Sequence, residues 1–202
     1  MLPQDKIVLL RERWSQCPPF NMRQRLAVPG GASPFGKTDL GLEDYRGCVI
    51  DDSLHKIVLE RIDFSYCTLG KGQFASTVRR CLFVGAAVEG NIGAAFEDCD
   101  FADATLRNSI LRGIYTRCIL IRTDLSLVRS AQARFVDCVF DEASLKKASF
   151  FSCQFVRCSF LGSKFGSGSL AKSTFEECRF SEPNFSTVVL DGTRGLEWYS
   201  RM

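Results

Sequence analysis

The segment ASFFSCQFVRCSFLGSKFGS, residues 148–167, decides the fold, because a bulky apolar residue recurs in it at every fifth position. The residues at these positions are Phe150, Phe155, Phe160 and Phe165. A period of five matches neither the 3.6 residues of a helical turn nor the two-residue alternation of a strand. The chain must therefore turn regularly, with the recurring residue of each pentad facing a shared interior. We call that residue the centre of its pentad.

The same period extends over about three quarters of the chain, as expected of a repeat protein. From Ile110 to Leu190 the spacing is five without a break, and only Ser130 places a polar residue at a centre. We expect Ser130 to be a hydrogen-bonded core residue between Ile110 and Phe150. Upstream, as far back as Leu40, a few steps are shortened to four residues, which predicts a looser or bent first half. These steps follow Ile50, Phe74, Val88, Ile92 and Leu106.

A small side chain stands two residues before most centres, which predicts a second inward position in each pentad. If four pentads make one coil, every fourth centre falls on the same side of the rod. Coils pair like strands about 4.8 Å apart, which exceeds the roughly 3.5 to 4.5 Å between the Cβ atoms of a disulfide. We therefore expect the cysteines of one such column to pack as small buried hydrophobes. They are Cys81, Cys99, Cys118, Cys138, Cys158 and Cys178.

Segments such as CDFADATLRN (99–108) and STFEECRFSEPNFST (173–187) repeat a small residue, a polar residue, Leu or Phe, and two variable positions. In this pattern the chain resembles the pentapeptide-repeat family. The resemblance implies an all-β fold, a right-handed four-sided β-helix, here a solenoid of about eight coils. It divides the chain into an N-terminal capping helix and loop (1–39), the β-helix (40–190) and a short C-terminal cap (191–202).

The N-terminal segment is suited to cover the first coil, because an open solenoid exposes unpaired strand edges at its ends. In PQDKIVLLRERWSQC (3–17), Ile7, Leu10 and Trp14 fall on one face of a predicted amphipathic helix. Pro18 and Pro19 follow and predict its end.

The C-terminal segment GLEWYSRM (195–202) offers Leu196, Trp198 and Tyr199 after the last centre. We expect these side chains to seal the last coil. The alternative is a homodimer contact, as in relatives with an apolar C-terminal element.

Composition places the chain among single globular domains, with 202 residues of which 46% are hydrophobic and 24% charged. Charged residues interrupt the first twenty positions well short of the ~18 apolar residues that span a bilayer, and no secretory signal is recognisable. We therefore expect a cytoplasmic protein without membrane contact. The net charge of +3 is too small to predict direct nucleic-acid binding.

Residues for catalysis or metal binding are scarce. The chain has no CxxC pair, its single histidine is His55, and no glycine-rich phosphate loop is present. Neighbouring acids such as Asp51 and Asp52 fall on outward, solvated positions. The sequence predicts a non-enzymatic protein with no catalytic residue, no metal site and no cofactor.

One outward edge carries charges whose sign largely alternates from coil to coil, which stabilises stacked strands by roughly 0.2 to 1 kcal/mol per pair. The family resemblance implies, as an alternative function, a negatively charged DNA mimic that protects or inhibits DNA gyrase. Alternating charges cancel the field that such a mimic needs. The edge comprises Glu60, Arg61, Arg79, Arg80, Glu97, Asp98, Arg117, Asp137, Arg157, Glu176 and Glu177.

Apolar residues also occupy outward positions around the cysteine column. A contiguous apolar patch usually marks an interface, whereas cover by a loop or the strand preference of branched residues would explain them without a function. We predict that this face binds a protein, either an immunity- or effector-type partner from a bacterium or a second copy of the chain. The residues are Leu82, Val84, Ile119, Ile121, Val136, Val139, Val156 and Leu161.

Overall fold

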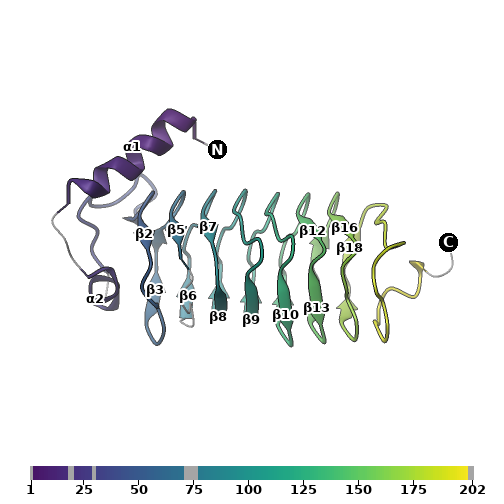
Figure 1. Cartoon of the computed structure of the whole chain (residues 1–202). Coiled ribbons are helices and arrows are strands. Elements are labelled where there is room, and N and C mark those ends of the chain that lie inside the picture. The colour runs from purple at the N-terminus through teal and green to yellow at the C-terminus, as the bar shows by residue number, and fades with distance from the viewer. Residues whose placement is uncertain (1, 18–20, 29–30, 71–76, 200–202) are drawn as a thin grey trace.

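The computed structural model describes residues 2–17, 21–28, 31–70 and 77–199. They form a rod of stacked coils, a parallel β-solenoid of about seven turns with two described helices at its N-terminal end (Figure 1). The predicted all-β solenoid is therefore confirmed, and it has about seven turns because the eight stacked centres from Tyr45 to Phe180 are joined by seven steps. The predicted centre Phe74 and the prolines Pro18 and Pro19 lie outside the described residues.

Neighbouring coils pair in parallel with a nearly constant offset. In the second half β11 (Arg134–Val136) pairs with β14 (Gln154–Val156), twenty residues further on. In the first half β3 (Val58–Glu60) pairs with β6 (Thr77–Arg79), nineteen residues further on. Four pentads thus make one coil, and some early coils are a residue or two shorter. The right-handed, four-sided cross-section stays a prediction.

The longest path of paired strands runs along the rod from β17 (Thr174–Glu176) through β14, β11, β9 (Ile110–Thr116), β8 (Asn91–Glu97) and β6 to β3. Shorter ladders stack on the other sides of the coils (Figure 1). The strands on these ladders are β1 (Glu43–Asp44), β2 (Val49–Ile50), β4 (Ile62–Asp63), β5 (Thr68–Leu69), β7 (Ala87–Val88), β10 (Arg129–Ala131), β12 (Ser144–Lys146), β13 (Ser149–Phe151), β15 (Ser159–Phe160), β16 (Lys164–Gly166) and β18 (Arg179–Phe180).

Two strands are longer than the rest because a corner is missing from their coils. β8 (Asn91–Glu97) and β9 (Ile110–Thr116) are paired along all seven residues. Gly113 of β9 has φ +94°, and a Cβ there would lie 2.2 Å from the Ala94 carbonyl oxygen, so the close approach requires glycine. Shortened steps therefore merge two sides into one strand. The expected loosening is not seen in this pair, whose ladder is uninterrupted.

Two predicted centres were wrong. Leu40 is 69% exposed and lies outside the core, and the predicted centre Ile110 is displaced by one residue. Leu111 is fully buried, whereas Ile110 is partly exposed, and Leu111 is the residue beside Ser130. The four-residue step therefore follows Leu111 rather than Leu106. Ser130 itself is buried and its Oγ lies 3.3 Å from the Cys153 Sγ, which confirms the predicted hydrogen-bonded core residue.

Aromatic centres stack along the interior. Phe155 lies between Phe135 and Phe175, with ring centroids 5.0 and 4.7 Å away and planes within 8° of parallel. Contacts between columns are edge-to-face, as between Phe155 and Phe160 at 5.5 Å and 72°. Each geometry adds about 0.5 to 1.5 kcal/mol to the burial of the rings.

The corners of the coils place ordinary residues in the left-handed region. Asp98, Arg117, Asp137 and Arg157 have φ between 51° and 54°. In this conformation the N–H points along the rod, and that of Arg117 donates to the Val136 carbonyl oxygen at 2.9 Å. Left-handed backbone costs roughly 1 to 2 kcal/mol per residue, so the inter-coil hydrogen bonds and the packed interior must outweigh that cost.

Helix α1 (Gln4–Ser15) packs on the first coil, as predicted. Ile7 is buried, Leu10 and Trp14 are partly buried, and the Trp14 ring stacks on Tyr45 at 5.8 Å. This contact extends an aromatic column of the interior out to the helix. The sequence did not predict a second helix.

That second helix, α2 (Met22–Ala27), lies at the end of the rod (Figure 1). The Asn21 side chain caps it by accepting a hydrogen bond from the Gln24 N–H at 2.8 Å. Leu26 is buried in the core of the first coils. With only six residues, this helix is stabilised mainly by that packing.

The C-terminal cap is also present. Leu196 is buried, and the Tyr199 ring meets Phe185 edge-on at 5.0 Å. Trp198 contacts Phe180 at 5.7 Å and remains 39% exposed. The cap therefore covers part of the last coil and leaves Trp198 partly open to solvent.

Arg13 joins helix α1 to the first coil. Its guanidinium contacts the two Asp44 carboxylate oxygens at 2.6 and 3.0 Å and donates to the Arg46 carbonyl oxygen at 2.8 Å. The Arg46 guanidinium pairs with Asp44 as well, at 2.8 Å. Burial alone would raise the pKa of Asp44, but the hydrogen bonds and charges of both arginines outweigh it and hold that pKa well below its usual range.

We expect Asp44→Asn to lower the free energy of unfolding at pH 7 by about 3 kcal/mol, because it leaves the partly buried Arg13 without its counter-charge. Since the folded pKa is depressed, the contribution of Asp44 is present above about pH 4 and is lost as the pH falls below it. Denaturant unfolding of the wild-type protein and the variant, from pH 7 to below about pH 4, measures the difference in their free energies of unfolding. This difference should become smaller as the pH falls. Asp191→Asn, at an exposed carboxylate, is the control. A difference that is constant with pH would contradict the assignment.

Candidate functional site on the outer faces of the solenoid

The predicted cysteine column lines one side of the rod, which we call the cysteine side. Its first five members are buried and Cys178, near the last coil, is partly exposed. Burial raises the pKa of Cys81. Cys138, in the middle of the column, is only 1% exposed. A thiol that solvent cannot reach is a poor candidate for chemistry.

The inward small residues also donate hydrogen bonds. The Cys138 Sγ lies 3.3 and 3.4 Å from the carbonyl oxygens of Tyr115 and Val136, acceptors that only a protonated thiol can serve. We therefore assign the column a structural role in the neutral form. The Thr123 hydroxyl, at the same position of the next side, donates to the Phe101 carbonyl oxygen at 2.8 Å. The sequence pattern marked these positions as small but not as donors.

The eight predicted partner-binding residues differ in exposure. Ile119 and Leu161 are 37% and 39% exposed. Val156 is buried at 9% exposed, because paired strands flank it on both sides, so its assignment to the outer surface is wrong. The other five are partly buried: Leu82, Val84, Ile121, Val136 and Val139.

Only part of this set is contiguous. Ile119 lies directly beside Val139 on the next coil, and Ile121 belongs to the same pentad as Ile119. Asp100 stands between Leu82 and Ile119 in the ladder. We call Ile119, Ile121 and Val139 the apolar patch.

Polar residues separate the remaining members from the apolar patch. Asp141 accepts a hydrogen bond from the Leu161 N–H at 2.9 Å and stands between Leu161 and Ile121. Val136 lies on the neighbouring side, across a charged corner that includes Asp137.

That charged corner contains the alternating charges predicted from the sequence. Arg117 contacts Glu97 and Asp98 at 2.7 Å each, and Arg157 contacts Asp137 at 2.7 Å. The hydrogen bond from Arg117 lowers the pKa of Asp98, and that from Arg157 lowers the pKa of Asp137. Exposed pairs of this kind contribute little to stability. Their main consequence is that opposite charges cancel along this edge.

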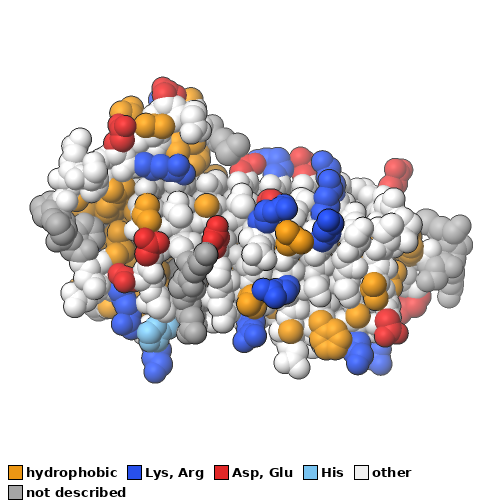
Figure 2. Space-filling view, viewed as in Figure 1, with side chains coloured by type: hydrophobic (Ala, Val, Ile, Leu, Met, Phe, Trp, Pro, Cys, Tyr) orange, Lys and Arg blue, Asp and Glu red, His pale blue; other side chains and the backbone are white. Residues whose placement is uncertain are grey.

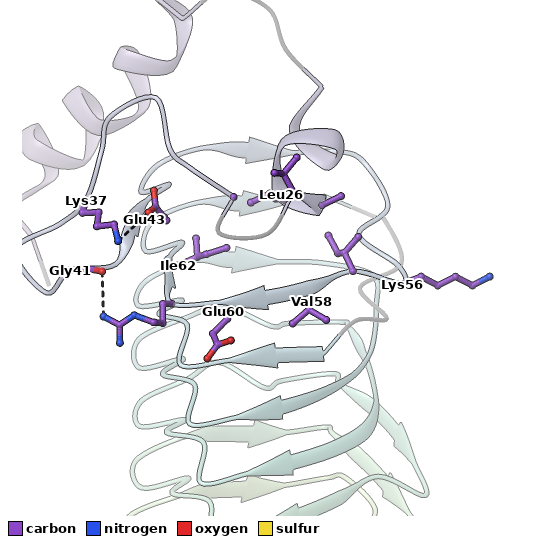
Figure 3. Close-up of a pocket in the computed structure, with 13 residues that line it drawn as sticks. Leu26, Lys37, Gly41, Glu43, Lys56, Val58, Glu60 and Ile62 are labelled. Atoms are coloured by element: carbon purple, nitrogen blue, oxygen red, sulfur yellow. Dashed lines mark hydrogen bonds and ion pairs between the residues drawn. The ribbon is translucent and has the colours of Figure 1, made fainter.

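A groove of about 590 Å³ lies between α2, the loop that leads into the first coil, and strands β3 and β4 (Figure 3). Two of its charged groups are engaged with neighbours, since Lys37 pairs with Glu43 at 3.5 Å and Arg61 donates to the Gly41 carbonyl oxygen at 3.4 Å. Lys56 extends away from the groove (Figure 3). The described lining residues include no Ser, Thr, Cys or His, which are common nucleophiles and bases.

None of the described residues form a group of three or more His, Cys, Asp or Glu side chains placed to hold a metal ion. His55 Nδ1 lies 3.1 Å from the Ser53 Oγ in the first coil. Neither of the two described helices has the length and apolar character needed to cross a bilayer.

Comparison with known proteins supports the fold. No protein-family model and no curated protein matches the sequence. A trypsin-treated variant of QnrB1, a plasmid-mediated fluoroquinolone resistance protein, matches with a TM-score of 0.59 at 14% identity, over 76% of this chain and 92% of that one. The chain has the pentapeptide-repeat fold. HetL, a pentapeptide repeat protein involved in heterocyst differentiation in Nostoc, matches 72% of this chain and 85% of its own at 16% identity and a TM-score of 0.25.

The pentapeptide-repeat interior predicts which thiols react. A thiol-specific chromogenic reagent should modify at most Cys17 and Cys178 of the ten cysteines in the native protein, because the other eight are buried. All ten should react in denaturant. The double variant Cys17→Ser, Cys178→Ser should leave no fast-reacting thiol. Fast modification of Cys138 in that variant would contradict the burial of the column.

Proposed function

We propose that this protein is a non-enzymatic binding scaffold whose cysteine side holds a protein partner at the apolar patch. The observation that carries the proposal is the contiguity of Ile119, Ile121 and Val139 on paired coils. Ile119 is 37% exposed and lies between the inward-facing Cys118 and Leu120. An exposed apolar cluster costs solubility, and on soluble proteins such clusters often mark interaction sites.

The surroundings of the patch suit a protein interface. Asp100 and Asp141 flank it along the rod, and the Arg122 guanidinium contacts Asp103 beside it at 2.7 Å. Interfaces commonly combine an apolar centre with a polar rim. The paired backbone beneath is rigid, so little conformational entropy is lost on binding.

The partner is either another bacterial protein, of the immunity or effector type, or a second copy of this chain. A second copy could use the apolar patch or the C-terminal cap, where Trp198 is 39% exposed. These alternatives differ in stoichiometry and in the residues they bury. We place the protein in the cytoplasm, in keeping with the sequence expectation.

A gyrase-directed DNA mimic is the alternative function. Its support is the family resemblance and the acidic residues Asp100, Asp141 and Glu142 on the cysteine side. Against it, the acids of the charged corner are paired with arginines at 2.7 Å, which weakens the negative field. The main proposal therefore rests on the apolar patch rather than on charge.

The variant Ile119→Lys, Ile121→Ser should weaken complex formation at least about tenfold, because it places a charge and a hydroxyl at the centre of the apolar contact. Analytical ultracentrifugation measures self-association, and affinity capture from the native host followed by titration of the recovered protein measures a heterologous complex. Val49→Ser is the matched control, since Val49 is 58% exposed on another side of the rod.

Unchanged affinity of the double variant, with an intact fold by circular dichroism, would refute the apolar patch as the binding site. A supercoiling assay separates the alternative function. Inhibition or protection of gyrase that survives the double variant but is lost on removal of Asp141 and Glu142 would favour the DNA mimic.

A further inference from the structure

The small net charge of the chain conceals a strong separation of charge across the rod. In the four coils that span residues 94–172, the two sides formed by 104–113, 124–132, 143–152 and 163–172 carry seven Lys or Arg and one Asp, a net charge of +6. The other two sides of the same coils, 94–103, 114–123, 133–142 and 153–162, carry four Arg and seven acids, a net charge of −3. We call the first half the basic side. Its bases are Arg107, Arg112, Arg129, Lys146, Lys147, Lys164 and Lys172.

The bases of this side are exposed and mostly free of carboxylates. Each of the seven has an exposed side chain. In the part of the chain that the structure describes, one ion pair occurs on the basic side, between Arg107 and Asp124 at 3.8 Å. The arginines of the charged corner, in contrast, contact acids at 2.7 Å. Ion pairs therefore give the arginines of the charged corner a structural role, whereas most positive charges of the basic side have no such partner.

Lys and Arg side chains gather over the middle of the rod on the face seen in Figure 2. Strand pairing brings the basic coils together, since Arg129 lies beside Ile110 on one coil and Ser149 on the next, and Lys146 beside Gly166. Most positions between the bases carry small or polar side chains, so an extended ligand can approach the backbone closely. They include Thr105, Asn108, Ser144, Ser152, Ser167 and Ser169.

One end of the basic side is hollowed. A groove of about 510 Å³ is lined by Arg107, Asn108 and Arg129 among others. The Asn91 Oδ1, also in its lining, is buried without a hydrogen-bond partner among the described residues. The groove thus combines two guanidinium groups and one carboxylate, that of Glu89, with an acceptor that a sugar hydroxyl or a base amino group can satisfy.

We propose that the basic side binds the phosphate backbone of a nucleic acid, without reading its sequence. Protein interfaces are depleted in charge at their centre, whereas interfaces with nucleic acid are polar and strongly positive, as this surface is. Four coils about 4.8 Å apart span roughly 14 Å, along which a duplex presents about eight phosphates at one per about 1.7 Å. Phe151, 44% exposed with Lys172 at 5.4 Å from its ring, offers a stacking face for an unpaired base.

This binding is independent of the proposed protein partner, because it uses different sides of the coils. It also reverses the expectation of no nucleic-acid contact, which rested on the net charge alone. Electrostatic binding of this kind has a steep dependence on salt.

The test is fluorescence anisotropy of the full chain with a duplex of about 20 base pairs and the single strand of the same sequence, between about 50 and 200 mM salt. We expect both probes to bind, with affinity falling about 100-fold over this range if some four phosphates are contacted. The triple variant Arg112→Gln, Arg129→Gln, Lys146→Gln should bind at least about tenfold more weakly, with a slope of log affinity against log salt shallower by about 2 to 3.

The matched control is Arg117→Gln, Arg122→Gln, Arg157→Gln, which removes the same three charges from the charged corner and the cysteine side. It should retain affinity within about twofold, because those arginines are paired with acids. An equal loss in both triple variants, with folds intact by circular dichroism, would overturn the assignment to the basic side. So would the absence of binding at about 50 mM salt, or a tighter interaction with polyglutamate than with either nucleic acid, which would identify an acidic protein as the ligand.

Discussion

The hydrogen-bond ladder between coils is the constraint on which the rest of the structure depends. At the corners, residues such as Arg117 and Arg157 adopt left-handed φ so that their N–H groups donate along the rod, at 2.9 and 2.8 Å. This ladder fixes the offset of about twenty residues and therefore superimposes every fourth centre. Only a large and a small side chain fit inward in each pentad, and both must repeat for the coils to stack. The period of five in the sequence follows from that constraint.

The same constraint explains what could be predicted from the sequence. Where the offset is a strict twenty, as from Phe135 to Phe175, the inward set was identified residue by residue. Where the chain is short of a residue, the pattern allows two phases, and local hydrophobicity cannot choose between Ile110 and Leu111, because both are apolar. Strand pairing decides which of the two faces inward, because Leu111 lies beside Ser130 on the next coil. Helix α2 was missed because its one buried residue, Leu26, gives no periodic signal.

The candidate sites were less predictable than the fold, because function depends on neighbours across coils. Val156 has the character of an interface residue but is covered by the strands on either side. Net charge summed along the chain was equally uninformative, since the fold sorts Arg112, Arg129 and Lys146 to one half of the rod and Asp98, Asp103 and Asp141 to the other. Each coil contributes few charges to each side, so the separation emerges only after several coils are stacked.

The two proposed binding surfaces on one rod need not communicate. Coupling between sites requires an element with two arrangements that both ligands bias. Here the stacked rings of Phe135, Phe155 and Phe175 fill the interior at centroid distances of 4.7 to 5.0 Å, and a close-packed core deforms little. A ligand on the apolar patch therefore leaves the backbone beneath the basic side in place. Because three of every five residues face outward, each surface can change by substitution without altering the ladder that supports the other.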